Sequence, residues 1–224
     1  MKFDSVFTKK SLRFWLGGSA ILCAILFGIV TFFFWWHDEQ VLAKYEKDLG
    51  QRQFVELLRR DKQKLGGRLS KEDRITYTMD LGLQWYVLGE NERAIQWWNK
   101  GLKLHPQNEI GWYNLGNAYR RIQNHQMAEK SYQTSIDVSK GGELNGCLAL
   151  GELYRVDYIE KRTQEPEVYK QCLQKSPNDR DLLAHLAVYY RDSGDRKQAV
   201  QYFDQLFSLE PSVEIGEELR KLRE

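Results

Sequence analysis

The chain has 224 residues, which is enough for one ordinary domain together with an anchor or a small second domain. Its formal net charge is only +2, from 33 basic and 31 acidic side chains, and this balance argues against a nucleic-acid-binding protein, which usually has a basic excess. The average conceals two regions, because an apolar N-terminal stretch precedes a polar, charge-rich remainder.

A long uncharged segment lies near the N-terminus. Residues 14–36 read FWLGGSAILCAILFGIVTFFFWW, and as an α-helix they would span roughly 34 Å, enough for a hydrocarbon core of about 30 Å. Aromatic rings at both ends match the aromatic belts of membrane helices. We therefore predict a transmembrane helix that contacts the lipid bilayer through residues 14–36. The alternative is a signal peptide cleaved after residues 41–43, but the apolar run is longer than such peptides have.

The charges that flank this segment predict its orientation. Residues 1–13 contain four Lys or Arg residues and a single Asp, whereas Asp38 and Glu39 follow the apolar run. By the positive-inside rule, residues 1–13 are a short cytoplasmic tail. We expect a single-pass membrane protein whose remaining chain is extracytoplasmic, and periplasmic if the source is bacterial.

Residues 37–70 predict an amphipathic helical linker or stalk. Apolar residues recur at helical spacing with charges between them, and Gly50 marks an expected interruption. Gly66 and Gly67 end this helix. The sequence from Ser70 to Asp73 is a capping-box-like start for the next one.

Internal repetition dominates residues 71–211. A motif of Leu, a small residue and an aromatic residue three positions later occurs at Leu81, Leu115, Leu150 and Leu186. A second motif, Ala followed four residues later by an aromatic ring, occurs at Ala94, Ala128 and Ala199. Each repeat predicts two antiparallel helices, whose close approach the small residue permits while the large rings fill the space between units.

This pattern resembles the tetratricopeptide repeat family, whose signature is W-x2-L-G-x2-Y…A-x3-F…P over about 34 residues. Residues 112–119, WYNLGNAY, match that signature nearly letter for letter. The resemblance implies an all-α fold in which an α-solenoid of about four helix pairs follows the transmembrane helix. The units are expected at about 75–108, 109–143, 144–179 and 180–213, with a capping helix at 212–224.

Turn-forming residues predict where the two helices of a unit are joined. They occur at Asn91-Glu92, Asn124-His125 and Gly194-Asp195. The third unit differs, because Arg155 to Pro166 contains about two extra residues and lacks the small residue that opens a second helix. We expect a longer turn and looser packing there.

Cys147 and Cys172 fall on the two predicted helices of the third unit. In an extracytoplasmic domain they could form a disulfide across the long turn. The alternative is two small buried core residues.

The sequence has no constellation of residues that predicts catalysis. It contains no phosphate-binding loop, nucleophile elbow or dinucleotide fingerprint. The four histidines and the third cysteine, Cys23, lie without partners at metal-ligand spacing. We therefore expect no enzyme activity, no metal, no cofactor and no small-molecule substrate.

The resemblance implies that the first helix of each unit lines a concave groove that takes a segment of another protein. The expected lining residues are Met79, Leu83, Tyr86, Val87, Tyr113, Asn117, Arg120, Arg121, Leu148, Glu152, Arg155, Ala184, Val188 and Arg191. This groove would be apolar near the anchor, with a row of arginines further along. The arginines either bind an acidic or C-terminal peptide or are merely solvated.

Two functions fit this organisation. The first is a membrane-tethered adaptor or assembly factor that binds a partner protein in the groove. The second is a stable accessory subunit of a larger membrane protein complex. In both, the partners are other proteins and not nucleic acids.

Overall fold

The computed structural model describes residues 9–139 and 144–224, with side chains from residue 23 onward. All regular secondary structure within these ranges is helical, so the all-α prediction is confirmed for them. The chain divides into two compact units, residues 1–56 and 57–224, each of which is described by itself.

The first unit contains helix α1 (Lys9–Ala43) and the beginning of α2 (Leu49–Leu65). The break between the helices falls at residues 44–48, just before the predicted position. A carboxylate oxygen of Asp48 accepts the backbone N–H of Gly50 at 2.8 Å. Because this bond satisfies an otherwise unpaired N–H at the start of α2, Gly50 belongs to the helix and Asp48 begins it.

The predicted membrane-spanning segment, residues 14–36, lies within α1. Among the described residues, the combination of length and apolarity needed to cross a membrane is not met by any helix. The predicted cytoplasmic tail, residues 1–13, falls largely outside the described residues, and so do the side chains of residues 14–22.

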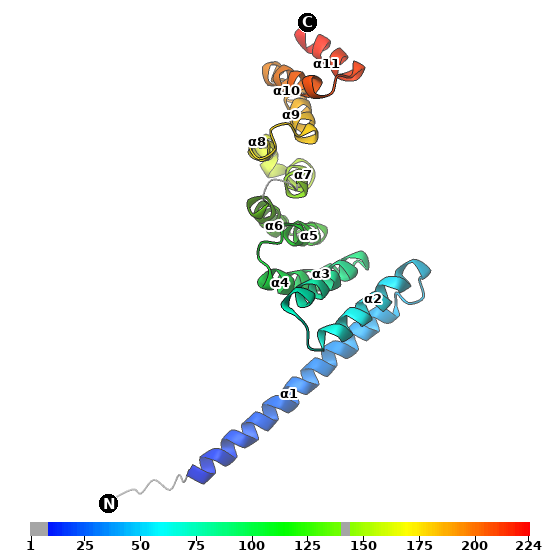
Figure 1. The fold of residues 1–224 in the computed structure, drawn as a ribbon, viewed down its shortest axis with the longest axis vertical. Helices are drawn as coiled ribbons and strands as arrows, with labels where there is room; N and C mark the ends of the chain where they lie inside the picture. The colour runs from blue at the N-terminus through cyan, green and yellow to red at the C-terminus, as the bar shows by residue number, and fades with distance from the viewer. Residues whose placement is uncertain (1–8, 140–143) are drawn as a thin grey trace, which may run out of the picture. The chain divides into compact units, whose positions relative to one another are not determined.

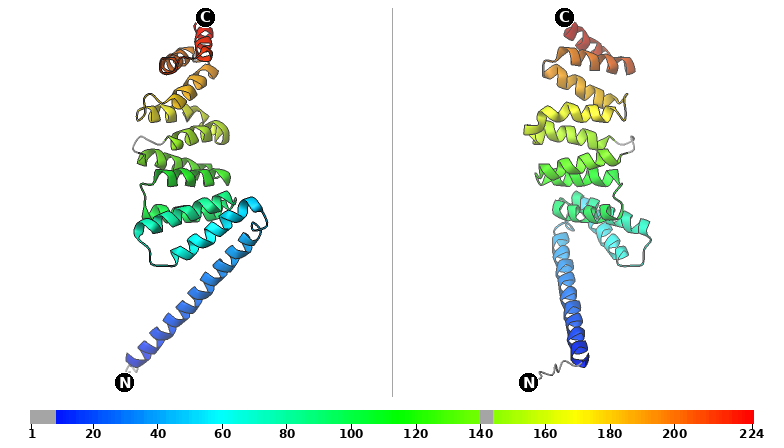
Figure 2. Two further views of the ribbon diagram at one scale, coloured as in Figure 1. Left: turned by 45° about the vertical axis from the view of Figure 1, so that its right-hand side comes forward. Right: turned by 90° about the vertical axis from the view of Figure 1, so that its left-hand side faces the viewer.

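The second unit is a stack of helix pairs that follow one another in chain order (Figures 1 and 2). The end of the predicted second repeat, residues 140–143, lies outside the described residues. The helices are α3 (Lys71–Val87), α4 (Asn91–Leu104), α5 (Glu109–Arg121), α6 (His125–Val138), α7 (Asn145–Glu152), α8 (Glu165–Leu173), α9 (Arg180–Asp192), α10 (Arg196–Leu209) and α11 (Val213–Arg223).

Helices α3, α5, α6, α9, α10 and α11 begin with side-chain caps. The Ser70 hydroxyl accepts the backbone N–H of Asp73 at 3.0 Å, which confirms the predicted start of α3. Asn124 caps α6 and Asp195 caps α10 through the same type of bond. Each cap satisfies one of the N–H groups that a helix leaves unpaired at its first turn.

The turns within three of the helix pairs share one backbone conformation. Gly89, Gln123 and Gly194 have φ angles of 82°, 59° and 80°, the left-handed region in which glycine is favoured. The prediction of a turn at Asn91-Glu92 was wrong, because Asn91 is already the first residue of α4. The turn precedes it, around Gly89, because the N–H groups of Gly89 and Glu90 bond back to α3 and close the turn before Asn91.

The small residues of the first motif permit a close approach between the helices of a pair. A Cβ atom added to Gly116 of α5 would lie 2.5 Å from the ring of Tyr132 in α6. Trp98 and Tyr169 lie equally close to the glycines of their own units. Because these rings are buried, glycine and ring together form the centre of these three helix pairs.

The third unit has the longer connection that the sequence predicts. After α7 the chain forms a π-helical turn at Leu153–Asp157 and a 3₁₀ helix at Ile159–Gln164 before α8 begins. Cys147 and Cys172 are joined by a disulfide with a Cα–Cα distance of 6.3 Å. Both cysteines are also buried in the core, so this pair is at once a disulfide and part of the apolar packing.

Helix α11 covers the end of the stack. Leu219 is buried in the core, and Ile215 and Leu222 pack against it with partial exposure. The other side of the helix carries exposed charged residues. This arrangement matches the capping helix predicted at residues 212–224, which shields the last apolar layer from water.

Replacing Gly116 with alanine tests the close approach. The new methyl group would meet the Tyr132 ring, so we expect a loss of about 1–3 kcal/mol in the free energy of unfolding. The control is Gly216→Ala in α11, where the new Cβ lies 3.6 Å from Phe207 in ordinary contact. This control should gain up to about 1 kcal/mol from helix propensity. Urea denaturation of the two variants measures both changes, and equal effects would contradict the packing argument.

Candidate protein-interaction surface

The residues predicted to line the groove come from α3, α5, α7 with the turn that follows it, and α9, the first helices of the four units. On α3 and α5 they recur at intervals of three or four, which places them on one side of each helix. We call this set of side chains the first-helix face.

The α3 part of the first-helix face is apolar and open to solvent. Leu83 is 47% exposed and Val87 is 41% exposed, one helical turn further along. Met79 is positioned differently, because its side chain lies against Gly101 of α4 and Gly111 of α5. Met79 therefore contributes to helix packing, whereas Leu83 and Val87 expose aliphatic surface.

Tyrosines form the next part of the face. The Tyr86 ring lies 5.5 Å from the Trp98 ring, and the Tyr113 ring lies 6.2 Å from Tyr132. The Tyr132 hydroxyl donates a hydrogen bond of 2.7 Å to the side-chain oxygen of Asn117. These aromatic contacts anchor the half-exposed rings to the core and fix their orientation.

Arg120 is held by two carboxylates from the third unit. Its Nε donates to Asp157, and its Nη1 lies 3.3 Å from Glu152. Burial opposes the charge of Arg120, but the hydrogen bonds that Arg120 donates to Glu152 and Asp157 outweigh this effect and raise the pKa of the guanidinium. Arg120 therefore joins α5 to the third unit, and its charge is compensated inside the protein.

Arg121, the next residue, has a different environment. Its guanidinium carbon lies 3.8 Å from the centre of the Tyr86 ring. Its Nη1 donates a hydrogen bond of 3.1 Å to the backbone oxygen of Tyr86. The arginine thus links α5 to α3 through a cation–π contact and one hydrogen bond, and it remains exposed.

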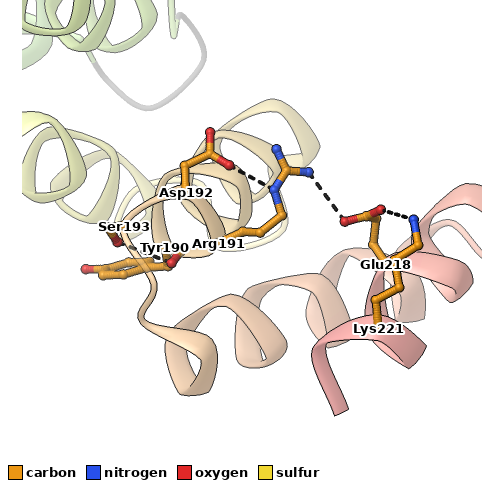
Figure 3. A network of polar contacts seen from close by, with 6 residues as sticks. All are labelled: Tyr190, Arg191, Asp192, Ser193, Glu218 and Lys221. Atoms are coloured by element: carbon orange, nitrogen blue, oxygen red, sulfur yellow. Dashed lines mark hydrogen bonds and ion pairs between the residues drawn. The ribbon is translucent and has the colours of Figure 1, made fainter. Parts of the chain in front are cut away.

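Arg191 in the fourth unit is also paired. Its Nε lies 2.9 Å from Asp192, and its Nη1 lies 3.5 Å from Glu218 of α11 (Figure 3). Lys221 contacts the same Glu218 at 2.8 Å. This network ties the capping helix to the last repeat through polar contacts at the surface.

A cavity of about 450 Å³ opens between the third unit and α9, and Leu148, half-buried on α7, does not line it. Arg155 and Val188, both predicted for the face, line this cavity together with Arg162, Glu165 and other residues. Arg155 lies 3.9 Å from the buried carboxylate of Glu165. Burial raises the pKa of Glu165, and the two arginines oppose that rise only in part.

Apart from Glu152, which was predicted for the face, the sequence did not reveal the acidic partners of these arginines. Asp157 and Glu165 lie at the irregular connection of the third unit, where no helical period predicts a side-chain direction. Glu218 lies on the capping helix, outside the repeat register. His185 was also missed as a cavity residue, and it stacks on Tyr169 at 5.0 Å. Burial lowers its pKa, and nearby Arg155 adds to this effect.

Sequence comparison identifies the repeats. A family model described as "TPR repeat" matches residues 82–123. A second, described as "Tetratricopeptide repeat", matches residues 111–141 and 181–213. These segments lie in the first, second and fourth units, and the irregular third unit lies between them. The expected repeat type is confirmed.

Solved structures of MamA are similar to this chain. One crystal structure of MamA has a TM-score of 0.56 and 21% identity, covering 79% of this chain and 96% of MamA. A second has a TM-score of 0.55 and 21% identity over 79% and 90% of the two chains. The MamA RS-1 ArsTM double mutant has a TM-score of 0.54 and 20% identity over 77% and 93%. At these identities the likeness shows the fold alone.

The neighbouring arginines of α5 allow a matched test of the ion pairs. Arg120→Gln leaves Glu152 and Asp157 without their cation, so we expect a loss of about 1–2 kcal/mol in the free energy of unfolding. Arg121→Gln removes only an exposed cation–π contact and one hydrogen bond, and should cost about 0.5 kcal/mol. Thermal unfolding of both variants provides the measurement. A larger loss for Arg121→Gln would contradict the assignment.

Proposed function

We propose, from the tetratricopeptide repeats that this chain carries, that it is a membrane-tethered adaptor or assembly factor. It binds a segment of a partner protein on the first-helix face. The observation that carries this proposal is the exposure of aliphatic Leu83 and Val87 beside anchored tyrosines. Stacked helix pairs commonly use such a face for extended or helical peptides.

The side chains on this face are suited to binding and carry no arrangement that we assign to catalysis. Aromatic rings held by core contacts offer a large contact area without much loss of side-chain freedom. Arg120 and Arg191 already have carboxylate partners, so the face is less cationic than its composition indicates. We therefore propose that apolar contacts supply most of the binding energy.

The tether in this proposal is the segment 14–36, which contacts the bilayer. Apolar side chains from Ile25 to Trp36 are exposed along the described part of α1. A continuous apolar surface of this size is unfavourable in water and favours a lipid or protein environment. The Cys147–Cys172 disulfide supports a repeat domain outside the cytoplasm, where such bonds persist. The N-terminus would then be cytoplasmic.

The same apolar surface also supports the second function, an accessory subunit of a larger membrane protein complex. In that case other subunits, and not lipid alone, would cover the residues between Ile25 and Trp36. Purification in mild detergent separates the two functions. An adaptor should remain soluble and monodisperse when alone, whereas a subunit should aggregate or retain its partners in fixed ratio.

Site-specific photo-crosslinking tests the first-helix face. A photoreactive amino acid at Leu83 should capture a partner protein in cells, because this side chain is exposed on the proposed surface. The matched control is Lys130, which is also exposed but lies on α6, a second helix. Mass spectrometry identifies the captured protein. Crosslinks at Lys130 without any at Leu83 or Tyr113 would refute binding on the first-helix face.

Alkaline carbonate extraction of membranes tests the tether. The unaltered protein should stay in the membrane pellet, and the double substitution Phe27→Lys and Val30→Lys should weaken that retention, because each central Lys costs about 3 kcal/mol of insertion. Leu49→Lys, at an exposed position beyond the segment, should have no effect. Complete release of the unaltered protein would refute the tether. A separate experiment tests the orientation. Protease added to the extracytoplasmic side of intact inner membranes should digest the repeats.

A further inference from the structure

Arg121 differs from the other arginines predicted for the first-helix face. Arg120, Arg155 and Arg191 each lie within 4.0 Å of at least one carboxylate. Arg121 makes no such ion pair with any residue that the structure describes. It therefore adds an uncompensated positive charge to this part of the face.

The position of Arg121 is nevertheless fixed. Its guanidinium lies over the Tyr86 ring at 3.8 Å, and one N–H is bound to the Tyr86 backbone oxygen. An arginine has five N–H donors, so most of them remain available to a ligand. Because the side chain is already ordered by two contacts, binding a partner costs less conformational entropy than it would at a free surface arginine.

Exposed aliphatic side chains occur on the same side of α3 as Tyr86, the residue that this guanidinium contacts. Leu83, Tyr86 and Val87 share one side of α3, and Tyr86 is the residue on which Arg121 rests. Leu83 and Val87 are each more than 40% exposed. The junction of the first two units thus combines an aliphatic surface with one oriented positive charge.

We propose that this junction, formed by Leu83, Tyr86, Val87 and Arg121, docks an amphipathic segment of a partner protein. The segment presents aliphatic side chains to α3 and the carboxylate of one Asp or Glu to Arg121. This inference rests on the proposed function and specifies the chemistry of the partner. The argument is charge complementarity, because a guanidinium with free donors matches a carboxylate in bidentate geometry.

A side-chain carboxylate fits the junction better than the C-terminal carboxylate of a peptide. Proteins often capture a chain end with several unpaired backbone N–H groups. Around Leu83, Tyr86 and Val87 the backbone is regular α-helix, whose N–H groups are already bonded within the helix. The junction therefore offers a single charged side chain, which suits a single acidic residue.

The test is a selection from a phage-displayed library of random peptides of about 15 residues, long enough to form a marginal helix. The bait is the full chain in detergent. Selected peptides should combine aliphatic residues with an Asp or Glu. Their affinity for Arg121→Gln should fall about tenfold, as for one charge-assisted contact, and Arg121→Lys should give an intermediate affinity. Lys130→Gln, which removes an exposed cation of α6 outside the first-helix face, should bind the peptides as the unaltered protein does.

Several outcomes would overturn the inference. It fails if no peptide is selected, if the selected peptides are basic, or if Arg121→Gln binds them unchanged.

Other outcomes would assign the site to a different occupant. A loss of affinity on amidation of the peptide C-terminus would assign it to a terminal carboxylate. Self-association that depends on Arg121 would assign it to a second copy. Crosslinking at Leu83 without any dependence on Arg121 would leave the proposed function intact. The absence of crosslinks on all first helices would remove both.

Discussion

The close contact between a small residue on the first helix of a unit and an aromatic ring on the second is the constraint on which the repeat structure depends. At Gly116 the ring of Tyr132 occupies the volume where a side chain would be. The ring can be completely buried only because that volume is empty. This contact brings the two helices together and leaves their outer sides for the next pair. The stack therefore grows by repeating one local solution to the burial of an aromatic ring.

Electrostatic contacts connect the units once packing has aligned them. Arg120 reaches from α5 to the third unit, and Arg191 reaches from α9 to the capping helix. The same side chains would be the obvious ligands for an acidic partner if only the sequence were considered. Their internal carboxylates change that interpretation, because a charge that holds two elements together is less available to a ligand. The ion pairs that connect the units therefore help to determine how much positive charge this face offers to a partner.

Much of the repeat fold could be predicted from the sequence, because it depends on local periodicity. The register of the helices follows from residue types at fixed spacing, and the cap at Ser70 follows from a short motif. The disulfide could be named as one of two alternatives, since a sequence does not give the distance between Cys147 and Cys172. The order of the helices and the capping role of α11 were also accessible in this way.

The side-chain environment of the face could be predicted only in part. Helical spacing places Met79 and Leu83 on the same side of α3, but the glycines of α4 and α5 draw Met79 into the packing. Asp157 reaches Arg120 from a π-helical turn, a geometry that no regular period indicates. The spacing of residues along one helix therefore determines which side chains lie on its face. The availability of a side chain depends on neighbours that are distant in sequence.

The disulfide of the third unit has a consequence for how the stack comes apart. In a linear array each element is stabilised by its neighbours, so disorder enters at an end and spreads inward one layer at a time. A covalent link between α7 and α8 limits how far these two helices can separate after their packing is lost. Fraying that starts at the C-terminal helix would meet this link before it reaches α5. The disulfide therefore hinders the spread of unfolding from the C-terminal helices to the junction of the first two units.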